Sequence, residues 1–245
     1  FFAMEFVDGR PLADILKDHR LARRPITPRL VVALGLQVAD ALEHAHSVAV
    51  DPQGNALRIL HRDLTPSNIL LDRSGQFKIS DFGVARAMGR TASLHTRHLV
   101  GKPSYVCPEA LKNLPIDERA DLWSLAVLMY EAIANRRLFK REAESATLLA
   151  VLEDPVPPLE TVRPGLGAAW QLFFDRALAK EPDQRYRDAH SFAVALLALQ
   201  AIEGRATPTE LSHLLAFGEE ELPLDETSEG FPDTVAPPRV ARSRE

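Results

Sequence analysis

Asp63 and Asn68 lie five residues apart in the stretch HRDLTPSN, and Asp81 follows thirteen residues later in DFG. A carboxylate can orient an attacking hydroxyl group for transfer of a phosphoryl group. Mg²⁺ prefers oxygen ligands from one or two protein carboxylates together with substrate phosphates. The spacing places Asp63 and Asn68 on one short loop and Asp81 on a turn that Gly83 permits. These side chains therefore predict phosphoryl transfer.

The pattern around these residues predicts the elements that position them. Apolar residues at helical spacing indicate several helices, which we expect near 11–18, 27–48, 121–135, 142–153, 168–179 and 188–202. Short apolar runs indicate strands, which we expect near 1–8, 57–60, 69–72 and 76–79, and Ser74-Gly75 predicts a hairpin between the last two. The segment 121–135 is apolar nearly all round, so we expect it to be a buried central helix. Residues 81–109 show little periodicity and predict a long functional loop.

Composition limits the possible partners and location. Of the 245 residues, 46% are hydrophobic and the net charge is −5, without the concentrated basic face that nucleic acid would require. The one cysteine, Cys107, excludes an internal disulfide, and no apolar run is long enough to span a bilayer. We therefore expect a cytoplasmic protein with no nucleic acid partner. Because the chain opens at Phe1 inside an apolar run, we also expect it to be a piece of a longer protein.

The order of motifs resembles that of eukaryotic-type protein kinases. HRDxxxxN followed by DFG is similar to the catalytic and metal-binding loops of that family. Further similarities follow in family order, and they are Met4-Glu5-Phe6-Val7 (hinge), Cys107-Pro108-Glu109 (end of the activation segment), Asp121-Leu122-Trp123-Ser124 (central helix) and Arg185 (partner of Glu109). An insert at 49–58 and the residues at 65 and 102 resemble bacterial Ser/Thr kinases, notably those of myxobacteria.

The resemblance implies a protein-kinase-like α+β fold, of which this piece is mainly the α-helical C-terminal lobe with a few short strands. Residues 1–202 would be the kinase domain, beginning at the hinge. Residues 203–245 would be a C-terminal extension. From about 219 the extension is rich in acidic residues, Pro, Ser and Thr, which predicts a disordered linker.

The resemblance also assigns roles by position. Asp63 would be the catalytic base, and Asn68 and Asp81 would bind Mg²⁺. The ATP-binding residues would be Met4 as gatekeeper, Glu5 and Val7 through their backbones, Leu70 as the floor beneath adenine, and Asn68 and Asp81 through the metal. The implied cofactors are ATP and Mg²⁺, and the implied partners are protein substrates. His61 is expected to pack against the DFG loop, and Asp121 to cap the central helix and fix the catalytic loop. Trp123 is expected to lie in the core, and Cys107 to be a small buried residue.

The sequence departs from the family at two places. Nothing in the 245 residues resembles the Gly-rich loop or the strand lysine that holds the phosphates, so we expect the piece to be inactive by itself. Thr65 and Lys102 stand where the family usually has Lys and Thr, which indicates either an exchange of roles or independent drift. The alternatives are a pseudokinase-type binding or scaffold protein, and a small-molecule phosphotransferase. The intact Asp63, Asn68 and Asp81 argue against a pseudokinase, and the activation-segment motifs argue against a small-molecule phosphotransferase.

Overall fold

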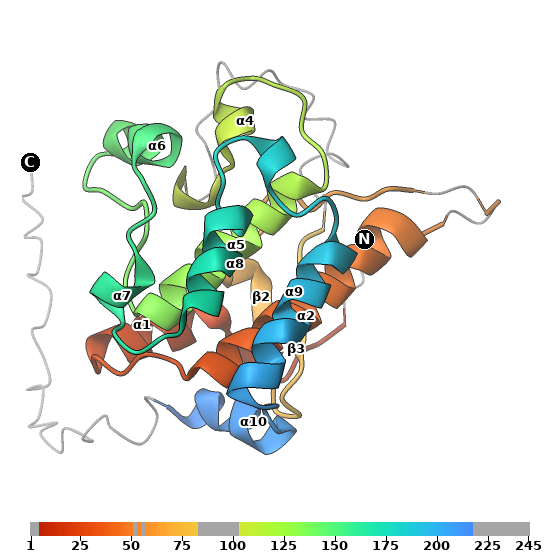
Figure 1. Ribbon diagram of the computed structural model, residues 1–245. Helices are drawn as coiled ribbons and strands as arrows, with labels where there is room; N and C mark the ends of the chain where they lie inside the picture. The colour runs from red at the N-terminus through yellow and green to blue at the C-terminus, as the bar shows by residue number, and fades with distance from the viewer. Residues whose placement is uncertain (1–4, 51–52, 55–56, 83–102, 218–245) are drawn as a thin grey trace, which may run out of the picture.

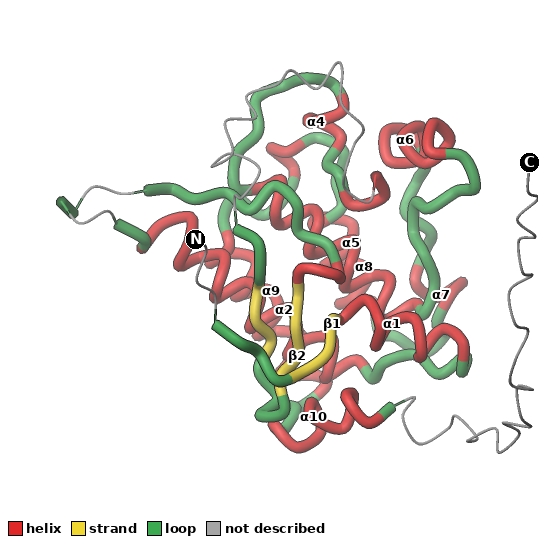
Figure 2. The backbone as a smooth tube through the Cα atoms, turned by 180° about the vertical axis from the view of Figure 1, so that it is seen from behind, coloured by secondary structure: helices red, strands yellow, loops and turns green. Residues whose placement is uncertain are grey.

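The computed structural model of the chain describes residues 5–50, 53–54, 57–82 and 103–217. These residues form a helical body with a small sheet along one side (Figure 1; Figure 2). The helices are α1 (Leu12–Leu21), α2 (Pro28–Glu43), α4 (Pro108–Leu111), α5 (Arg119–Ala134), α6 (Glu144–Glu153), α7 (Leu159–Val162), α8 (Ala168–Ala177), α9 (Ala189–Glu203) and α10 (Pro208–Ala216). The strands are β1 (Gly9–Pro11), β2 (Ile69–Asp72) and β3 (Phe77–Ile79). No described helix is both long and apolar enough to cross a membrane.

Helix α5 is the centre of the helical body. Every residue of the helix after Arg119 is buried, including Trp123 and Glu131. The helix ends where Asn135 adopts a left-handed conformation with φ 52°, a geometry that Asn tolerates better than most residues. The predicted buried central helix is therefore confirmed, with its start two residues earlier than expected.

Helices α2, α8 and α9 pack around α5. At the contact of α2 with α5, a Cβ atom on Gly35 would lie 2.7 Å from the end of the Met129 side chain, so a larger residue here would force that side chain to move. Helix α2 starts at Pro28, as its sequence predicts, after an extended Thr27 whose side chain makes no cap hydrogen bond. A π-helical turn, His44–Val48, continues α2 toward the following loop.

The sheet has the strand order β1–β2–β3, and both pairs are antiparallel. The hairpin between β2 and β3 turns at Gly75, where φ is +81°, which confirms the predicted hairpin. Residues 57–60 are not a strand, because their backbone bonds to the π-turn and to the residue after it: Leu57 and Ile59 donate to the carbonyls of Ala49 and Ala45, both at 2.9 Å. Residues 5–8 are also not a strand, since pairing with β2 begins only at Gly9.

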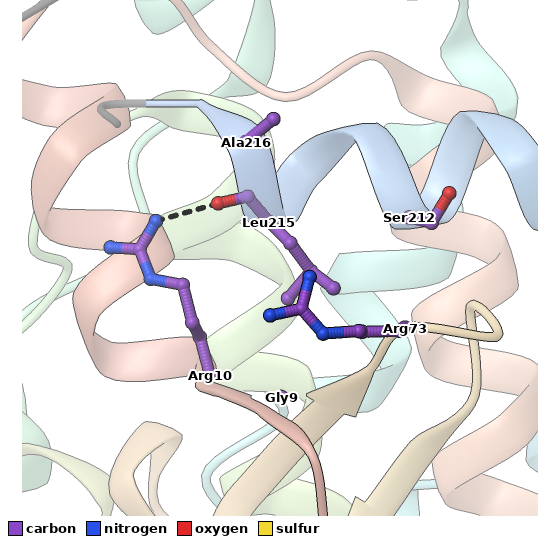
Figure 3. A pocket seen from close by; sticks show the side chains of 6 residues that line it. All are labelled: Gly9, Arg10, Arg73, Ser212, Leu215 and Ala216. Carbon is purple, nitrogen blue, oxygen red and sulfur yellow. Dashed lines mark hydrogen bonds between the residues drawn. The ribbon is translucent and has the colours of Figure 1, made fainter. Parts of the chain in front are cut away.

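Helix α10 was not expected from the sequence. Thr207 and Glu210 form a capping box at its start, and Leu211, Leu214 and Leu215 are buried. At its other end Arg10 of β1 donates to the carbonyls of Leu215 (2.9 Å) and Phe217 (3.0 Å), as Figure 3 shows for Leu215. Helix α10 therefore packs on the sheet beyond residue 202. The expected boundary at 202 stays a prediction, and the expected linker from 219 lies outside the described residues.

Candidate functional site

The loop before β2 brings Asp63 and Asn68 together. The side-chain amide of Asn68 donates to the backbone carbonyl of Asp63 at 2.8 Å and to its carboxylate at 3.3 Å. The 3₁₀ turn Pro66–Asn68 shapes the loop, and the Asn68 backbone N–H donates to the Thr65 carbonyl at 3.0 Å. Asp63 is exposed and Thr65 is buried. The arrangement leaves a carboxylate at the surface, on a loop that its own hydrogen bonds fix.

Asp121 of α5 holds this loop from beneath. Its carboxylate accepts hydrogen bonds from the backbone N–H groups of His61 and Arg62, each at 2.8 Å, and contacts His46 Nε2 at 2.8 Å. Arg62 has φ 65°, a strained conformation for a non-glycine residue that costs about 1–3 kcal/mol. The expected loop-fixing role of Asp121 is therefore confirmed, although α5 shows no side-chain cap hydrogen bond. Sequence reasoning missed the contact of His46 with Asp121. The signal that could have found it is a polar residue next to the apolar stripe of the predicted helix 27–48.

His61 links this loop to Asp81. The His61 ring contacts the Ser80 carbonyl through Nε2 at 2.9 Å, and it packs edge-on against Phe82 with ring centroids 4.8 Å apart. The Ser80 backbone N–H donates to the Asn68 carbonyl at 2.9 Å. Asp81, exposed and with φ 61°, follows directly. The two loops that carry Asn68 and Asp81 are thus joined by hydrogen bonds, and the expected packing role of His61 is confirmed.

The chemistry of the donor set fits a magnesium–nucleotide ligand. The hydrogen bonds of Asn68 use its amide nitrogen, so the amide oxygen is the atom it would offer to a cation. The described residues contain no group of three or more His, Cys, Asp or Glu side chains that could enclose a metal. A set of one amide and one or two carboxylates instead suits Mg²⁺, which takes its remaining ligands from phosphates and water.

The predicted adenine-contacting residues lie along the sheet. Residues 5–8 lead directly into β1, and Leu70 of β2, half-buried, pairs with Pro11 of β1. Lys78 of β3 donates to the Glu5 carboxylate, and this hydrogen bond raises the pKa of Lys78. This hydrogen bond fixes the Glu5 side chain to the sheet. The side chain of Val7 is half-buried. Met4 and Lys102 lie outside the described residues.

The Cys107-Pro108-Glu109 motif is anchored by a buried ion pair. Both nitrogens at the end of Arg185 donate to the two oxygens of Glu109 at 2.8 Å, and the two side chains are only 1% and 3% exposed. Burial would raise the pKa of Glu109, but the hydrogen bonds and charge of Arg185 outweigh it and lower the pKa. Burial raises the pKa of Cys107 to about 12, consistent with the small buried residue that the sequence predicts. The expected Glu109–Arg185 pair is confirmed.

Most of the chain is similar in sequence to known proteins. A family model described as "Protein kinase domain" matches residues 1–212. Tyrosine-protein kinase MasK of Myxococcus xanthus is 33% identical over 196 residues, which are 80% of this chain and 30% of that protein. Serine/threonine-protein kinase Pkn1 of the same species is 37% identical over 201 residues, or 80% of this chain and 27% of that protein.

A third relative is serine/threonine-protein kinase PknJ of Mycobacterium tuberculosis. It is 34% identical over 227 residues, which are 89% of this chain and 36% of that protein. The chain therefore spans about a third of the length of the curated relatives it matches. The resemblance to bacterial kinases of this type, including myxobacterial ones, is confirmed.

Proposed function

This chain belongs to the protein kinase domain family, and from that premise we propose that it is the catalytic part of an ATP-dependent serine/threonine protein kinase. The observation that carries the proposal is the pair of joined loops. Asn68 bonds to Asp63 on one loop, and its carbonyl accepts the hydrogen bond that brings in the loop of Asp81. The substrates would be hydroxyl groups of proteins.

Each residue of the joined loops has a defined task in this proposal. Asp63 accepts the proton of the substrate hydroxyl group as that oxygen attacks the γ-phosphate of ATP. Asn68 and Asp81 hold Mg²⁺, which neutralises phosphate charge when bound. The backbones of Glu5 and Val7 bind the adenine edge beside Met4, and Leu70 lies beneath the ring. Asp121 keeps the backbone of the loop fixed by the hydrogen bonds described above.

A matched pair of variants tests the metal-binding role. The chain is joined at its start to a segment with the Gly-rich loop and strand lysine that protein kinases use to hold the phosphates, which supplies the elements absent from these 245 residues. In this chimera Asp81→Ala should abolish ATP-dependent phosphorylation, whereas Asp14→Ala, which removes another exposed carboxylate on α1, should leave it unchanged. Full turnover by the Asp81→Ala chimera would refute the assignment.

The proposal also concerns which side chain, Ser and Thr or Tyr, supplies the hydroxyl group that receives the phosphate. Relatives at similar identity are named both as tyrosine and as serine/threonine kinases. We favour Ser and Thr because the catalytic loop lacks the Ala or Arg near position 65 that is typical of tyrosine kinases. Phosphoamino-acid analysis of the chimera's product should show phosphoserine or phosphothreonine. A product that is mainly phosphotyrosine would contradict the assignment.

Thr65 and Lys102 form the second unusual feature of the proposed site. We propose that Lys102 supplies the positive charge that the family usually places at position 65. Its ammonium group would offset charge on the transferred phosphoryl group, while Thr65 would donate a hydrogen bond to Asp63. What supports this is the paired exchange of residue types. A Lys102→Ala chimera with unimpaired kcat would rule it out.

The chain by itself is proposed to be a poor kinase. Its residues 1–202 correspond to the large helical lobe, and the 245 residues include no Gly-rich loop or phosphate-binding lysine ahead of Glu5. Positioning of the phosphates supplies much of the catalysis of phosphoryl transfer, so its loss should leave little activity. The intact Asp63, Asn68 and Asp81 favour a catalyst over a pseudokinase scaffold. Efficient phosphorylation of a protein substrate by the purified 245-residue chain would contradict this reading.

A further inference from the structure

Two arginines, Arg20 and Arg137, lie close together near the segment that follows Lys102. Arg20 is in the last turn of α1, and Arg137 follows the end of α5. The side-chain amide of Asn135 donates to the carbonyl of His19 at 3.0 Å, which joins the end of α1 to the loop after α5. Burial lowers the pKa of Arg20, and the charge of Arg137 lowers it further, so the two guanidinium groups act on each other.

The negative charge in this cluster comes from Glu131, which is fully buried in α5. Its carboxylate accepts hydrogen bonds from the Tyr105 hydroxyl at 2.7 Å, from Arg137 Nη1 at 2.8 Å and from the backbone N–H of Leu138 at 3.1 Å. Tyr105 stays neutral, because burial raises its pKa well above the ordinary value. Two arginines and one carboxylate therefore leave the cluster with one positive charge that is not balanced.

Arg20 is the residue whose charge is left over. Its Nη1 is buried and has no hydrogen-bond partner among the described residues. The preceding acid of α1, Asp18, is bound to Arg10 at 2.6 Å. A buried donor without a partner is uncommon in folded proteins and calls for an explanation. A water molecule would satisfy the donor but would not balance the charge, whereas an anion would do both.

The cluster can be reached from solvent. Arg20 is half-buried, and the side chain of Arg137 is 32% exposed. Both hydrogen bonds of Arg137 to Glu131 and Tyr105 come from Nη1, which leaves Nη2 and Nε for another acceptor. Guanidinium groups hold carboxylate and phosphate groups through paired hydrogen bonds, so two of them side by side suit such an anion.

The cluster lies beside the segments that carry the proposed catalytic residues. Helix α1 contacts the 3₁₀ turn Pro66–Asn68, which follows Asp63 on the catalytic loop. Tyr105 belongs to the 3₁₀ turn Pro103–Tyr105, directly after Lys102. An extended peptide advances about 3.3–3.6 Å per residue. A substrate residue a few positions from the phosphorylated one can therefore reach the cluster.

Resting on the proposed function, we propose that Arg20 and Arg137 form a specificity site that binds an acidic side chain of the protein substrate. The bound group is a carboxylate or the phosphate of an already phosphorylated residue. It accepts hydrogen bonds from Arg20 and from Nη2 of Arg137, while Glu131 holds Nη1 of Arg137 in place. Arg20 thus selects among substrates and takes no part in the transfer of the phosphoryl group.

Peptide phosphorylation by the active chimera tests the preference. In a set of peptides with a single Ser, one Glu is moved through the positions on both sides of the Ser, and each peptide is compared with its Gln counterpart. At one position, or at two neighbouring ones, Glu should raise kcat/KM roughly tenfold or more, mainly by lowering KM. Arg20→Gln should remove this ratio, whereas Arg205→Gln, which changes an exposed arginine between α9 and α10, should keep it.

The outcomes separate the specificity site from the proposed function. If the chimera phosphorylates the Glu and Gln peptides equally at every position, the specificity site is wrong and the kinase function stands. A chimera that phosphorylates none of the peptides contradicts the kinase function, and the site falls with it. Peptides with phosphoserine in place of Glu identify the anion: a gain with phosphoserine alone assigns the site to phosphorylated substrates, and a gain with Glu assigns it to carboxylates.

The melting temperature of the 245-residue chain separates a binding role of Arg20 from a structural one. Arg20→Gln removes a buried cation that has no acceptor for Nη1, so the melting temperature should stay unchanged or rise. Arg137→Gln takes a charged donor from the buried Glu131 and should lower it. If Arg20→Gln lowers the melting temperature as much as Arg137→Gln does, Arg20 stabilises the fold and the proposal is overturned.

Discussion

Replacing Arg185 by Met should be among the most destabilising single changes in the described part of the chain. Arg185 donates twice to the buried carboxylate of Glu109, and also to the carbonyls of Ala179 (2.8 Å) and Lys180 (3.0 Å). The guanidinium group also lies over the Trp123 ring, 4.8 Å from its centroid. Arg185→Met removes two charged hydrogen bonds from a buried carboxylate and takes the donor from two carbonyls, which should lower the free energy of unfolding by about 3–5 kcal/mol.

The loss should depend on pH. In the native protein Arg185 keeps the pKa of Glu109 low, so this stabilisation is present above the unfolded pKa and is lost as pH falls through the folded pKa. In Arg185→Met the hydrogen bonds from Cys107 and from the backbone of Glu109 remain, but Arg185 no longer offsets burial, so the pKa of Glu109 rises and its charged form becomes costly. The destabilisation should therefore be largest near neutral pH and smaller as pH falls toward the ordinary carboxylate range, where Glu109 takes up a proton.

Urea unfolding at several pH values, followed by circular dichroism, measures both effects. The matched control is Arg73→Met, which breaks an Arg–Asp pair at 2.9 Å whose side chains are 76% and 66% exposed. An exposed pair of this kind contributes at most about 1 kcal/mol. Adding Glu109→Gln to Arg185→Met should recover part of the loss by removing the unpaired charge. If Arg185→Met lowers the free energy of unfolding no more than Arg73→Met does, the Glu109–Arg185 pair does not anchor this part of the fold.

Three further predictions concern the core and the proposed site. Leu128→Ala, in the fully buried middle of α5, should lower the free energy of unfolding by about 2–5 kcal/mol in a urea titration, and a loss below that range would contradict a tightly packed core. In the active chimera Asp121→Asn should lower kcat by roughly 10²-fold, because an amide nitrogen would face the backbone N–H groups of the catalytic loop. An unchanged kcat would show that the catalytic loop keeps its conformation without the Asp121 carboxylate. Lys102→Ala should lower kcat by roughly 10²-fold, and Thr65→Lys with Lys102→Thr should recover much of the loss if the two residues have exchanged roles.

The sequence predicts the residues of the candidate site better than it predicts which short segments form strands or helices. Motifs with fixed spacing led directly to the hydrogen-bonded pair of Asp63 and Asn68. The Glu109–Arg185 pair spans 76 residues and was expected only because the chain resembles a family that has it. Periodicity could not have provided it, since Glu109 lies in the four-residue helix α4 and Arg185 follows the 3₁₀ turn Pro182–Gln184, and both elements are too short to show a periodic pattern. The buried central helix was predictable from its uniformly apolar composition.

The wrong predictions share a physical cause, which is that pairing decides where a strand forms. Residues 57–60 have strand-like composition, but their hydrogen bonds go to Ala45 in the π-turn and to Ala49 just after it. Residues 5–8 read as a strand, yet the strand that forms is the three-residue β1, whose Gly9 and Pro11 are poor strand formers. Helix α10 was missed, although Thr207 and Glu210 have the spacing of a capping box.

The rate of a single turnover in the active chimera, with and without Asp63→Asn, tests the central claim most directly. The claim is that the carboxylate of Asp63, on the loop held by Asn68 and Asp121, acts as the base for phosphoryl transfer. The substitution keeps the size of the side chain, so the melting temperature should change little. The rate should fall by roughly 10²–10⁴-fold. A rate within threefold of the unchanged chimera would contradict the proposed mechanism.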